Sequence, residues 1–320
     1  MILVNSNHDD VSTMMVAKWL HYLKKPFILL FDNATINNIC FTNDENAYFE
    51  LADGRQFFFD KTSSYWYRRG QNRFQKRQET VDGKLPKFNQ KAKKFLIDEN
   101  VSFSDFIDYY LSTKKSINKL SSSKNVNKLI LADIAKKSGF KTPATVITNS
   151  KKELKAFIHK HGSAITKPIE TLLDYSTDHH WLPMYTEEVT QKIFDQLPDT
   201  FAYSLFQEKI EKKYELRIFC LHKQKYAMAI FSQRDQQTSI DFRKYNMKKP
   251  NRNIPFQLPN QYSKMIDEFM ERSGYNSGSF DILVDQKNDY YFLEINPVGQ
   301  FGMVSLPCNY YLEKKIAQYL

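Results

Sequence analysis

The chain has 320 residues and a formal net charge of +10, and 42% of its residues are hydrophobic and 15% aromatic. This length exceeds one typical domain, so we expect two or three lobes with sizeable cores. The composition excludes a disordered protein, and no apolar run approaches the length of a membrane-spanning helix. The positive charge attracts anions such as nucleic acid, a membrane surface, or a nucleotide with an acidic peptide, and it does not choose between them.

The cysteines and the N-terminus indicate the compartment. Cys40, Cys220 and Cys308 lie far apart and outside C-x-x-C spacing, which argues against both a disulfide framework and a zinc site. The N-terminus MILVNSNHDD has no basic segment followed by an apolar core, so it does not resemble a signal peptide. We therefore expect a soluble protein of the reducing cytoplasm.

The first part of the chain predicts a small α/β lobe. Its predicted elements are strands over 2–6 and 26–31, a helix over 11–23 between them, and a hairpin over 47–51 and 56–59. Strand, helix and strand in this order are the pattern of a βαβ unit. The turn residues Asp53 and Gly54 favour the hairpin.

A polar boundary separates this lobe from the next. A basic, helix-prone stretch covers 84–112, and the serine-rich segment 112–127 has no apolar periodicity, which is typical of a linker. The predicted elements beyond it are helices over 127–138 and 151–162 and strands over 145–148 and 163–167. Ser150 and Glu153 form a capping box at the start of the second helix.

The last part is predicted to be rich in β-structure. Its predicted elements are strands over 204–210, 214–221 and 225–231, a helix over 261–273, a hairpin over 279–296 and a final helix over 310–320. Together with the first two parts, this order predicts a mixed α/β (α+β) fold.

The hairpin over 279–296, SFDILVDQKNDYYFLEIN, carries the strongest chemical signal. Alternation places Asp281 opposite Glu294 and Ser279 opposite Asn296, all on one face. Two carboxylates and an amide at this spacing suit Mg²⁺, which prefers hard oxygen ligands. The alternative is that these residues only form the solvent-exposed face of a half-buried pair of antiparallel strands.

This register assumes a four-residue turn, Gln286 to Asp289, that pairs Asp285 with Tyr290. The opposite face then carries two apolar rows that can pack on a core: Phe280, Ile282 and Val284 against Tyr291, Leu293 and Ile295.

No P-loop and no G-x-G-x-x-G motif occurs, so lysines and arginines must hold any nucleotide phosphates. Lys128 starts a predicted helix and Lys167 ends a predicted strand, but with 46 Lys and Arg residues a solvated side chain is the ordinary reading of each. Glu215 and Arg217 alternate on one face of YELRIFC, where the ordinary reading is an exposed ion pair worth less than about 1 kcal/mol.

Together these segments resemble the ATP-grasp ligases. Glu294-Ile295-Asn296-Pro297, followed by Gly299 and Gly302, is similar to the terminal metal motif of that family. The resemblance implies that Asp281, Glu294 and Asn296 hold two Mg²⁺ ions against the phosphates of ATP. Such a clamp neutralises charge on the transferring phosphoryl group and orients it for in-line attack.

The resemblance also implies the nucleotide contacts. Lys128 and Lys167 match the positions of the two phosphate lysines. The segment FQEKI is similar to the inter-lobe hinge, which makes Gln207, Glu208 and Ile210 candidate nucleotide-binding residues, with backbone groups around Glu208 and Ile210 at the adenine edge.

The E-L-R segment lies at the site in this family, so Glu215 is implied to bind the cofactor and Arg217 to stabilise the transferring phosphate through its planar fork of donors. Residues 169–180 contain no glycine, whereas many relatives have a glycine-rich phosphate lid there. The implied fold has three lobes with the nucleotide between the second and third. We place the domains at 1–118, 119–205 and 206–320.

Two more stretches resemble the graspetide peptide maturases, the microviridin type, and the closing run NPVGQFGMVSLPCNYYLEKKIAQYL most resembles their grasp-with-spasm members. The stretches are SYWYRRG, over 64–70, and the pattern that starts at Ser232-Gln233 and continues through Thr238 to Asp241-Phe242-Arg243. The implied reaction is ATP-dependent macrocyclisation of a ribosomal precursor peptide. An Asp or Glu side chain is phosphorylated, and a Ser/Thr hydroxyl attacks to give an ω-ester or a Lys amine to give an ω-amide.

Three arginines suit the acidic peptide. Arg243 is the best candidate for a bidentate contact to the core carboxylate. Arg68 and Arg69 could reach the site from the first lobe, or they could stack on aromatic rings at a strand edge. The basic first lobe and linker could also hold a leader peptide.

Two other functions stay open. One is an ATP-grasp ligase that joins a free amino acid to a protein or peptide carboxylate. The other is a non-catalytic basic protein that binds nucleic acid, which ranks low because the basic residues are scattered and no nucleic-acid motif occurs. We expect a precursor peptide as partner, no nucleic acid and no membrane, and a homodimer is open as the assembly.

Overall fold

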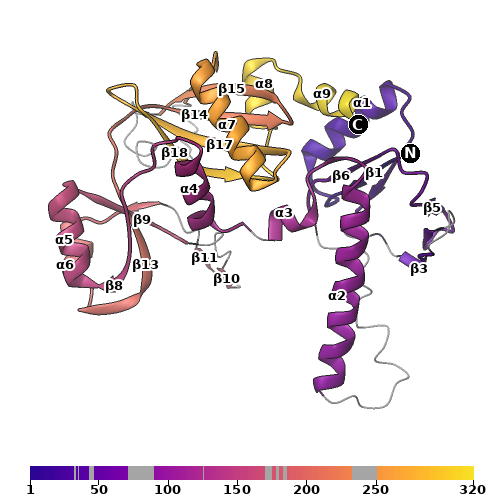
Figure 1. Ribbon diagram of the computed structural model, residues 1–320, viewed down its shortest axis with the longest axis horizontal. Coiled ribbons are helices and arrows are strands. Elements are labelled where there is room, and N and C mark those ends of the chain that lie inside the picture. Colours follow the sequence, from indigo (N-terminus) through magenta and orange to yellow (C-terminus); the bar gives the residue numbers. More distant parts are fainter. Residues whose placement is uncertain are drawn as a thin grey trace. The chain divides into compact units, whose positions relative to one another are not determined.

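The structure is a computed structural model, and it describes residues 1–31, 34, 36–42, 47–70, 90–124, 126–169, 175–177, 180–182, 186–232 and 251–320. The chain forms two compact units (Figure 1). Unit 1 comprises Met1–Asn125, Pro297–Ser305 and Tyr310–Leu320, and unit 2 comprises Val126–Asn296 and Leu306–Asn309. Within the described ranges, no helix has the length and apolar character needed to cross a bilayer.

Unit 1 is built on a four-stranded parallel sheet in the order β2-β1-β6-β7. Its strands are β1 (Ile2–Asn5), β2 (Phe27–Leu30), β6 (Ser64–Tyr67) and β7 (Lys115–Ile117). Helix α1 (Val11–Tyr22) connects β1 to β2, so the predicted βαβ unit is confirmed. All four residues of β1 and all four of β6 are buried, which is usual for the inner strands of a parallel sheet.

A second sheet in unit 1 carries the predicted hairpin. It is antiparallel, in the order β3 (Ile36–Cys40), β4 (Tyr48–Leu51) and β5 (Gln56–Phe58), and the turn between β4 and β5 contains Gly54 at φ 82°. One apolar cluster joins both sheets to the long helix α2 (Gln90–Ser112). Phe49, Phe57 and Phe59 form its aromatic centre, with ring centroids 5.0 to 6.3 Å apart.

The predicted linker is wrong in its details. Residues 112–127 contain strand β7 and the short helix α3 (Leu120–Lys124). Ser116 and Ile117 are buried because β7 pairs with β6. A strand of three residues carries no periodicity that the sequence could show, and its pairing partner lies about fifty positions earlier, so only the tertiary fold reveals it.

The C-terminal helix belongs to unit 1. Helix α9 (Leu312–Tyr319) contacts α1 of that unit. Ser64 Oγ donates to the carbonyl of Leu320 at 2.8 Å, and Lys25 Nζ donates to that of Gln318 at 2.8 Å. Helix α8 (Gly302–Cys308) precedes it. The three-part division of the chain stays a prediction.

Unit 2 begins with a four-stranded antiparallel sheet in the order β12-β9-β13-β8. Its elements are β8 (Thr145–Ser150), β9 (Ala164–Lys167), β12 (Glu187–Glu188) and β13 (Thr200–Glu208), with α5 (Lys151–His161) and α6 (Gln191–Gln196). Ser150 caps α5 by accepting from the Glu153 amide at 3.4 Å, which confirms the predicted helix start. A separate pair consists of β10 (Tyr175–Thr177) and β11 (His180–Leu182).

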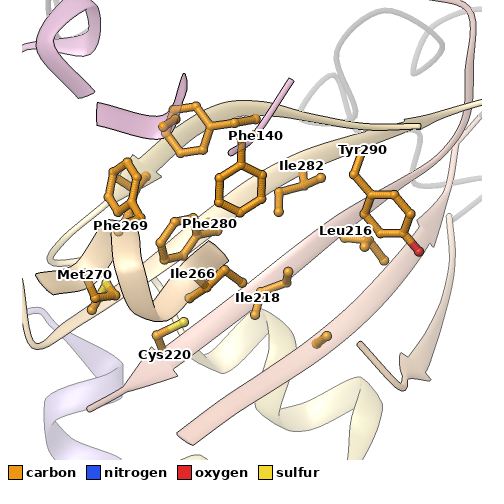
Figure 2. Close-up of a cluster of buried hydrophobic side chains, with 14 of the residues drawn as sticks. Phe140, Leu216, Ile218, Cys220, Ile266, Phe269, Met270, Phe280, Ile282 and Tyr290 are labelled. Carbon is orange, nitrogen blue, oxygen red and sulfur yellow. The ribbon is translucent and has the colours of Figure 1, made fainter. Parts of the chain in front are cut away.

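A five-stranded antiparallel sheet completes unit 2 in the order β16-β15-β14-β17-β18. Its strands are β14 (Lys212–Leu221), β15 (Gln224–Phe231), β16 (Arg252–Phe256), β17 (Ser277–Asp285) and β18 (Tyr290–Asn296). Helices α4 (Lys128–Lys137) and α7 (Asn260–Ser273) cover one face of it. Figure 2 shows Phe269 of α7 and Phe280 of β17 directed toward each other, with ring centroids 5.1 Å apart.

The hairpin of β17 and β18 confirms half of the predicted register. Asp281 pairs with Glu294 and Ser279 with Asn296, as the alternation required. The turn is tighter than predicted, because the Asp285 amide donates to the Asp289 carbonyl and Val284 pairs with Tyr290.

A β-bulge explains how the hairpin can have this tight turn and still pair Asp281 with Glu294. Ile282 pairs with Phe292 while Asp281 pairs with Glu294, so Leu293 is an extra residue in β18. The predicted apolar partners on β18 were therefore wrong in part: Tyr290 and Phe292 enter the core, and Tyr291 and Leu293 do not. Bulges of this kind re-aim side chains and are frequent beside active sites.

Candidate active site

One face of the five-stranded sheet carries the core, and the other carries five of the candidate residues. We call the second the polar face. Strand register places on it Lys212, Glu215 and Arg217 of β14, Ser279 and Asp281 of β17, and Glu294 and Asn296 of β18. The polar face exists because these residues alternate with the buried apolar ones on the same strands.

Three charged residues form a row across the middle of the polar face. Arg217 pairs with Asp281, and Asp281 pairs with Glu294 on the next strand. Arg217 Nη1 donates to both carboxylate oxygens of Asp281, at 2.9 and 2.8 Å, and both residues are 7% exposed. An ion pair in this setting is screened little by solvent, unlike the exposed pair that the sequence left open. The buried Nε of Arg217 makes no hydrogen bond to any described residue.

Helix α4 brings a second cation to the row. Lys128 is its first residue, and Lys128 Nζ lies 3.9 Å from Glu294 Oε2 and 3.4 Å from the carbonyl of Pro168. Asn127 fixes this end of α4, because its side chain accepts from the amides of Leu129 and Ile130 at 3.0 and 3.2 Å. The helix start therefore positions Lys128 beside a candidate metal ligand.

A buried pair lies at the start of β14. Lys212 Nζ donates to Glu215 Oε1, and Ser232 Oγ lies 3.4 Å from the same oxygen. A bulge at Lys213 makes this possible: Lys212 pairs with Asp285 and Tyr214 with Val284, so one residue of β14 is extra. The sequence did not single out Lys212, because in a regular strand it would face away from Glu215.

Two of the hinge candidates, Gln207 and Glu208, end strand β13 of the four-stranded sheet in unit 2. Gln207 is buried, and its Nε2 donates to Thr145 Oγ1 at 3.0 Å. Glu208 Oε1 accepts from the Ala144 amide at 2.8 Å. Ile210 lies in the connection between β13 and β14, and Lys167 ends β9, where it pairs with Leu205.

The structure separates the predicted residues by location. Lys128, Glu215, Arg217, Asp281, Glu294 and Asn296 gather at the five-stranded sheet. Lys167, Gln207 and Glu208 belong to the four-stranded sheet of unit 2, and Ile210 lies in the connection that follows β13. Arg243 lies outside the described residues, as do Gln233, Thr238, Asp241 and most of the glycine-free stretch 169–180. Arg68 and Arg69 belong to unit 1.

Arg68 is more deeply buried than a peptide-binding arginine needs to be. It is 2% exposed, and its Nη1 donates to the carbonyls of Val298 and Gly299 at 2.5 and 3.3 Å. Its guanidinium lies over the ring of Phe301, 5.3 Å from the centroid. Burial lowers the pKa of Arg68 to about 10, which leaves the group charged at neutral pH.

Asp10 compensates this buried charge. Its Oδ2 lies 3.3 Å from Arg68 Nε and 3.2 Å from Arg69 Nε. The Arg69 side chain is 40% exposed, so it keeps access to solvent that Arg68 lacks. The contact with the Phe301 ring favours the ring-stacking alternative for Arg68. A role in peptide binding stays a prediction for Arg68 and for Arg69.

The donor set fits Mg²⁺. Within the described ranges, no three His, Cys, Asp or Glu side chains cluster as a metal site would require. Asp281, Glu294 and Asn296 instead offer two carboxylates and an amide, which are hard oxygen donors. The buried Ser279 Oγ, on the residue paired with Asn296, makes no hydrogen bond to the described residues. Gly278 allows the two strands to approach here, since a Cβ on it would lie 3.2 Å from the Asn296 carbonyl oxygen.

No family model and no curated protein matches the sequence. Solved structures do. A RiPP-associated ATP-grasp ligase from Chryseobacterium gregarium, in complex with ADP and a leader and core peptide, is 26% identical with a TM-score of 0.80, and the match covers 99% of this chain and 94% of that one.

Two further structures share the fold. The macrocyclase MdnC from Microcystis aeruginosa MRC, bound with precursor peptide MdnA, is 23% identical with a TM-score of 0.76, covering 100% of this chain and 98% of that one. The ATP-grasp ligase PsnB, complexed with a phosphomimetic variant of its minimal precursor, Mg and ADP, is 14% identical with a TM-score of 0.70, covering 99% and 96%. The fold and the resemblance inferred from the sequence are therefore confirmed.

Proposed function

We propose that this ATP-grasp ligase is a macrocyclase that uses ATP to join side chains of a ribosomally made precursor peptide. An Asp or Glu side chain of the peptide attacks the γ-phosphate of ATP and becomes an acyl phosphate, with release of ADP. A Ser/Thr hydroxyl or a Lys amine of the same peptide then displaces phosphate, giving an ω-ester or an ω-amide and losing one water per linkage overall. Holding both reactive groups on one bound peptide supplies much of the acceleration.

The observation that carries this proposal is the row of Arg217, Asp281 and Glu294 on the polar face, with Lys128 beside it. Two anionic oxygen donors next to two cations are what a metal–nucleotide complex requires. Asp281, Glu294 and Asn296 would hold two Mg²⁺, which when bound neutralise charge on the phosphates.

This chain's own residues would then bind and orient the nucleotide. Lys128 and Lys167 contact phosphate oxygens, and Arg217 stabilises the transferring group. Gln207, Glu208 and Ile210 hold the adenine at the connection between β13 and β14, where the Ile210 backbone is outside any strand ladder. Arg243 orients the peptide carboxylate by a bidentate contact.

The relatives supply the substrate class. The Chryseobacterium gregarium ligase was solved with a leader and core peptide, and MdnC with a precursor peptide. We extend a peptide partner of this kind to the present chain. We also expect a cytoplasmic enzyme without nucleic-acid partners, and a homodimer stays open.

The test is to incubate the protein with ATP, Mg²⁺ and the precursor peptide encoded beside it and to weigh the product. Cyclisation removes the mass of one water for each linkage from a single peptide. A gain equal to an amino-acid residue would indicate the alternative ligase that conjugates free amino acids. Salt-sensitive DNA binding without any ATP turnover would contradict both.

Glu294→Gln tests the site assignment. It removes one anionic metal ligand while keeping the size of the side chain, so we expect Mg²⁺-dependent turnover to fall by at least a hundredfold with the thermal midpoint nearly unchanged. Glu271→Gln, which lies near the end of α7, is the matched control and should retain full turnover. Full activity in Glu294→Gln would refute the assignment.

A further inference from the structure

Lys212 joins the polar face through a backbone irregularity. In an unbroken strand, residues three positions apart point to opposite faces. The extra residue at Lys213 changes this, so Lys212 shares the face of Glu215 and Arg217. Lys212 is 8% exposed and Glu215 is 6% exposed, so the ion pair between them is buried.

The pair extends to a third buried residue. Glu215 Oε1 lies 3.4 Å from the hydroxyl of Ser232, which is 1% exposed and directly follows β15. Ser232 is also the first residue of the sequence pattern that ends in Arg243, the candidate for the peptide carboxylate. Lys212 thus holds a carboxylate of β14 that also contacts Ser232, the first residue of this pattern.

We propose that Lys212 is a positioning residue for the ATP-dependent reaction, acting through Glu215 and not on the reacting atoms. A buried carboxylate without a cation is costly, and it relieves the cost by taking up a proton or by moving. Lys212 holds the Glu215 carboxylate on the polar face, the face that also carries Arg217 and Asp281. This inference rests on the proposed function, because it is the nucleotide site that needs the fixed carboxylate.

Five variants test it: Lys212→Met, Lys212→Arg, Glu215→Gln, the double variant Lys212→Met/Glu215→Gln, and Lys213→Met as the matched control. Lys213 is exposed, and its Nζ donates to Oδ1 of the turn residue Asn288 at 2.9 Å. The measurements are the thermal midpoint, the affinity for a fluorescent ATP analogue in the presence of Mg²⁺, and the kcat and KM of water loss from the precursor peptide.

We expect Lys212→Met to lose thermal stability, because it removes the cation that pairs with the buried Glu215 carboxylate. The double variant buries no unpaired charge, so its stability should return toward that of the wild type. Its affinity for the nucleotide should nevertheless stay at least tenfold weaker. Lys212→Arg keeps the cation and should recover part of the affinity, and Lys213→Met should match the wild type in every measurement.

Recovery of both stability and nucleotide affinity in the double variant would overturn the proposal, since the pair would then be purely structural. The outcome for the proposed function is separate. If the wild type binds nucleotide but never removes water from the peptide, macrocyclisation is refuted, while the order of nucleotide affinities among the variants still decides the role of Lys212.

Discussion

Three buried carboxylates in the described part of the protein are paired with buried cations. Asp281 is paired with Arg217, Glu215 with Lys212, and Asp10 with Arg68. A buried ion pair gains little over an apolar pair of the same volume, yet removal of one partner is strongly destabilising. Residues of this kind are therefore sensitive to substitution for two reasons, stability and function, and variants have to separate the two.

Arg68 is the residue for which this separation matters most. We expect Arg68→Met to lower the free energy of unfolding by about 3–5 kcal/mol, because it leaves the Asp10 carboxylate without its most buried partner. Arg69→Met, at the exposed member of the group, should cost no more than about 1 kcal/mol. Chemical denaturation followed by circular dichroism measures both. Unchanged stability with a raised KM for the peptide would instead support direct peptide binding by Arg68.

The sequence identified candidate site residues where the chemistry of a side chain and the strand period agree. Asp281, Glu294 and Asn296 alternate with apolar residues, so their common face could be predicted, and the structure shows that face. Lys212 could not be found in this way, because its position depends on a bulge, and no residue in KKYELR indicates that a bulge forms there. The sequence left two interpretations of Arg68, reach toward the candidate site or stacking on aromatic rings, and its burial depends on a segment about 230 residues later in the chain.

At the scale of elements, two bulges set the composition of the polar face. The bulge at Leu293 keeps Glu294 and Asn296 opposite their partners despite the tight turn, and the bulge at Lys213 adds Lys212. Periodicity predicts strands and faces well, but an inserted residue shifts only part of a strand and leaves its alternation otherwise intact. This explains why the ligand end of the hairpin was predicted correctly and its turn was not.

Helix α4 offers an element-scale test, because its first residue is the candidate phosphate lysine. Asn127→Ala removes the acceptor for the amides of Leu129 and Ile130. We expect a loss of about 1 kcal/mol in stability and a severalfold weaker affinity for the nucleotide, because the first turn that carries Lys128 frays. Titration with a fluorescent ATP analogue measures the second effect.

Asn127→Ser is the matched control, since serine also caps helices well. It should retain both stability and affinity. Equal losses in the alanine and serine variants would show that the cap does not position Lys128, and that Asn127 acts by another route.

At the scale of the whole molecule, the segment Tyr310–Leu320 belongs to unit 1, together with the first part of the chain. Helix α9 lies against α1, and its residues Leu312, Ile316 and Ala317 are almost fully buried. This packing could not be predicted, because nothing in LEKKIAQY indicates which apolar surface the helix covers. The amphipathic pattern of a helix predicts that one face is buried, but it does not predict which part of the protein that face packs against.

Two compact units predict two separable responses to a core substitution. Ile316→Ala removes a side chain that is 1% exposed, and such truncations cost about 2–5 kcal/mol. Because α9 belongs to unit 1, native-state hydrogen exchange should accelerate in β1, β6 and α1, while the amides of β14 and β17 in unit 2 keep their protection. Gln318→Ala, at an exposed position on the same helix, should change neither set. Equal acceleration in both units would mean that the chain unfolds as one cooperative body, so that substitutions in α9 would also weaken the nucleotide site.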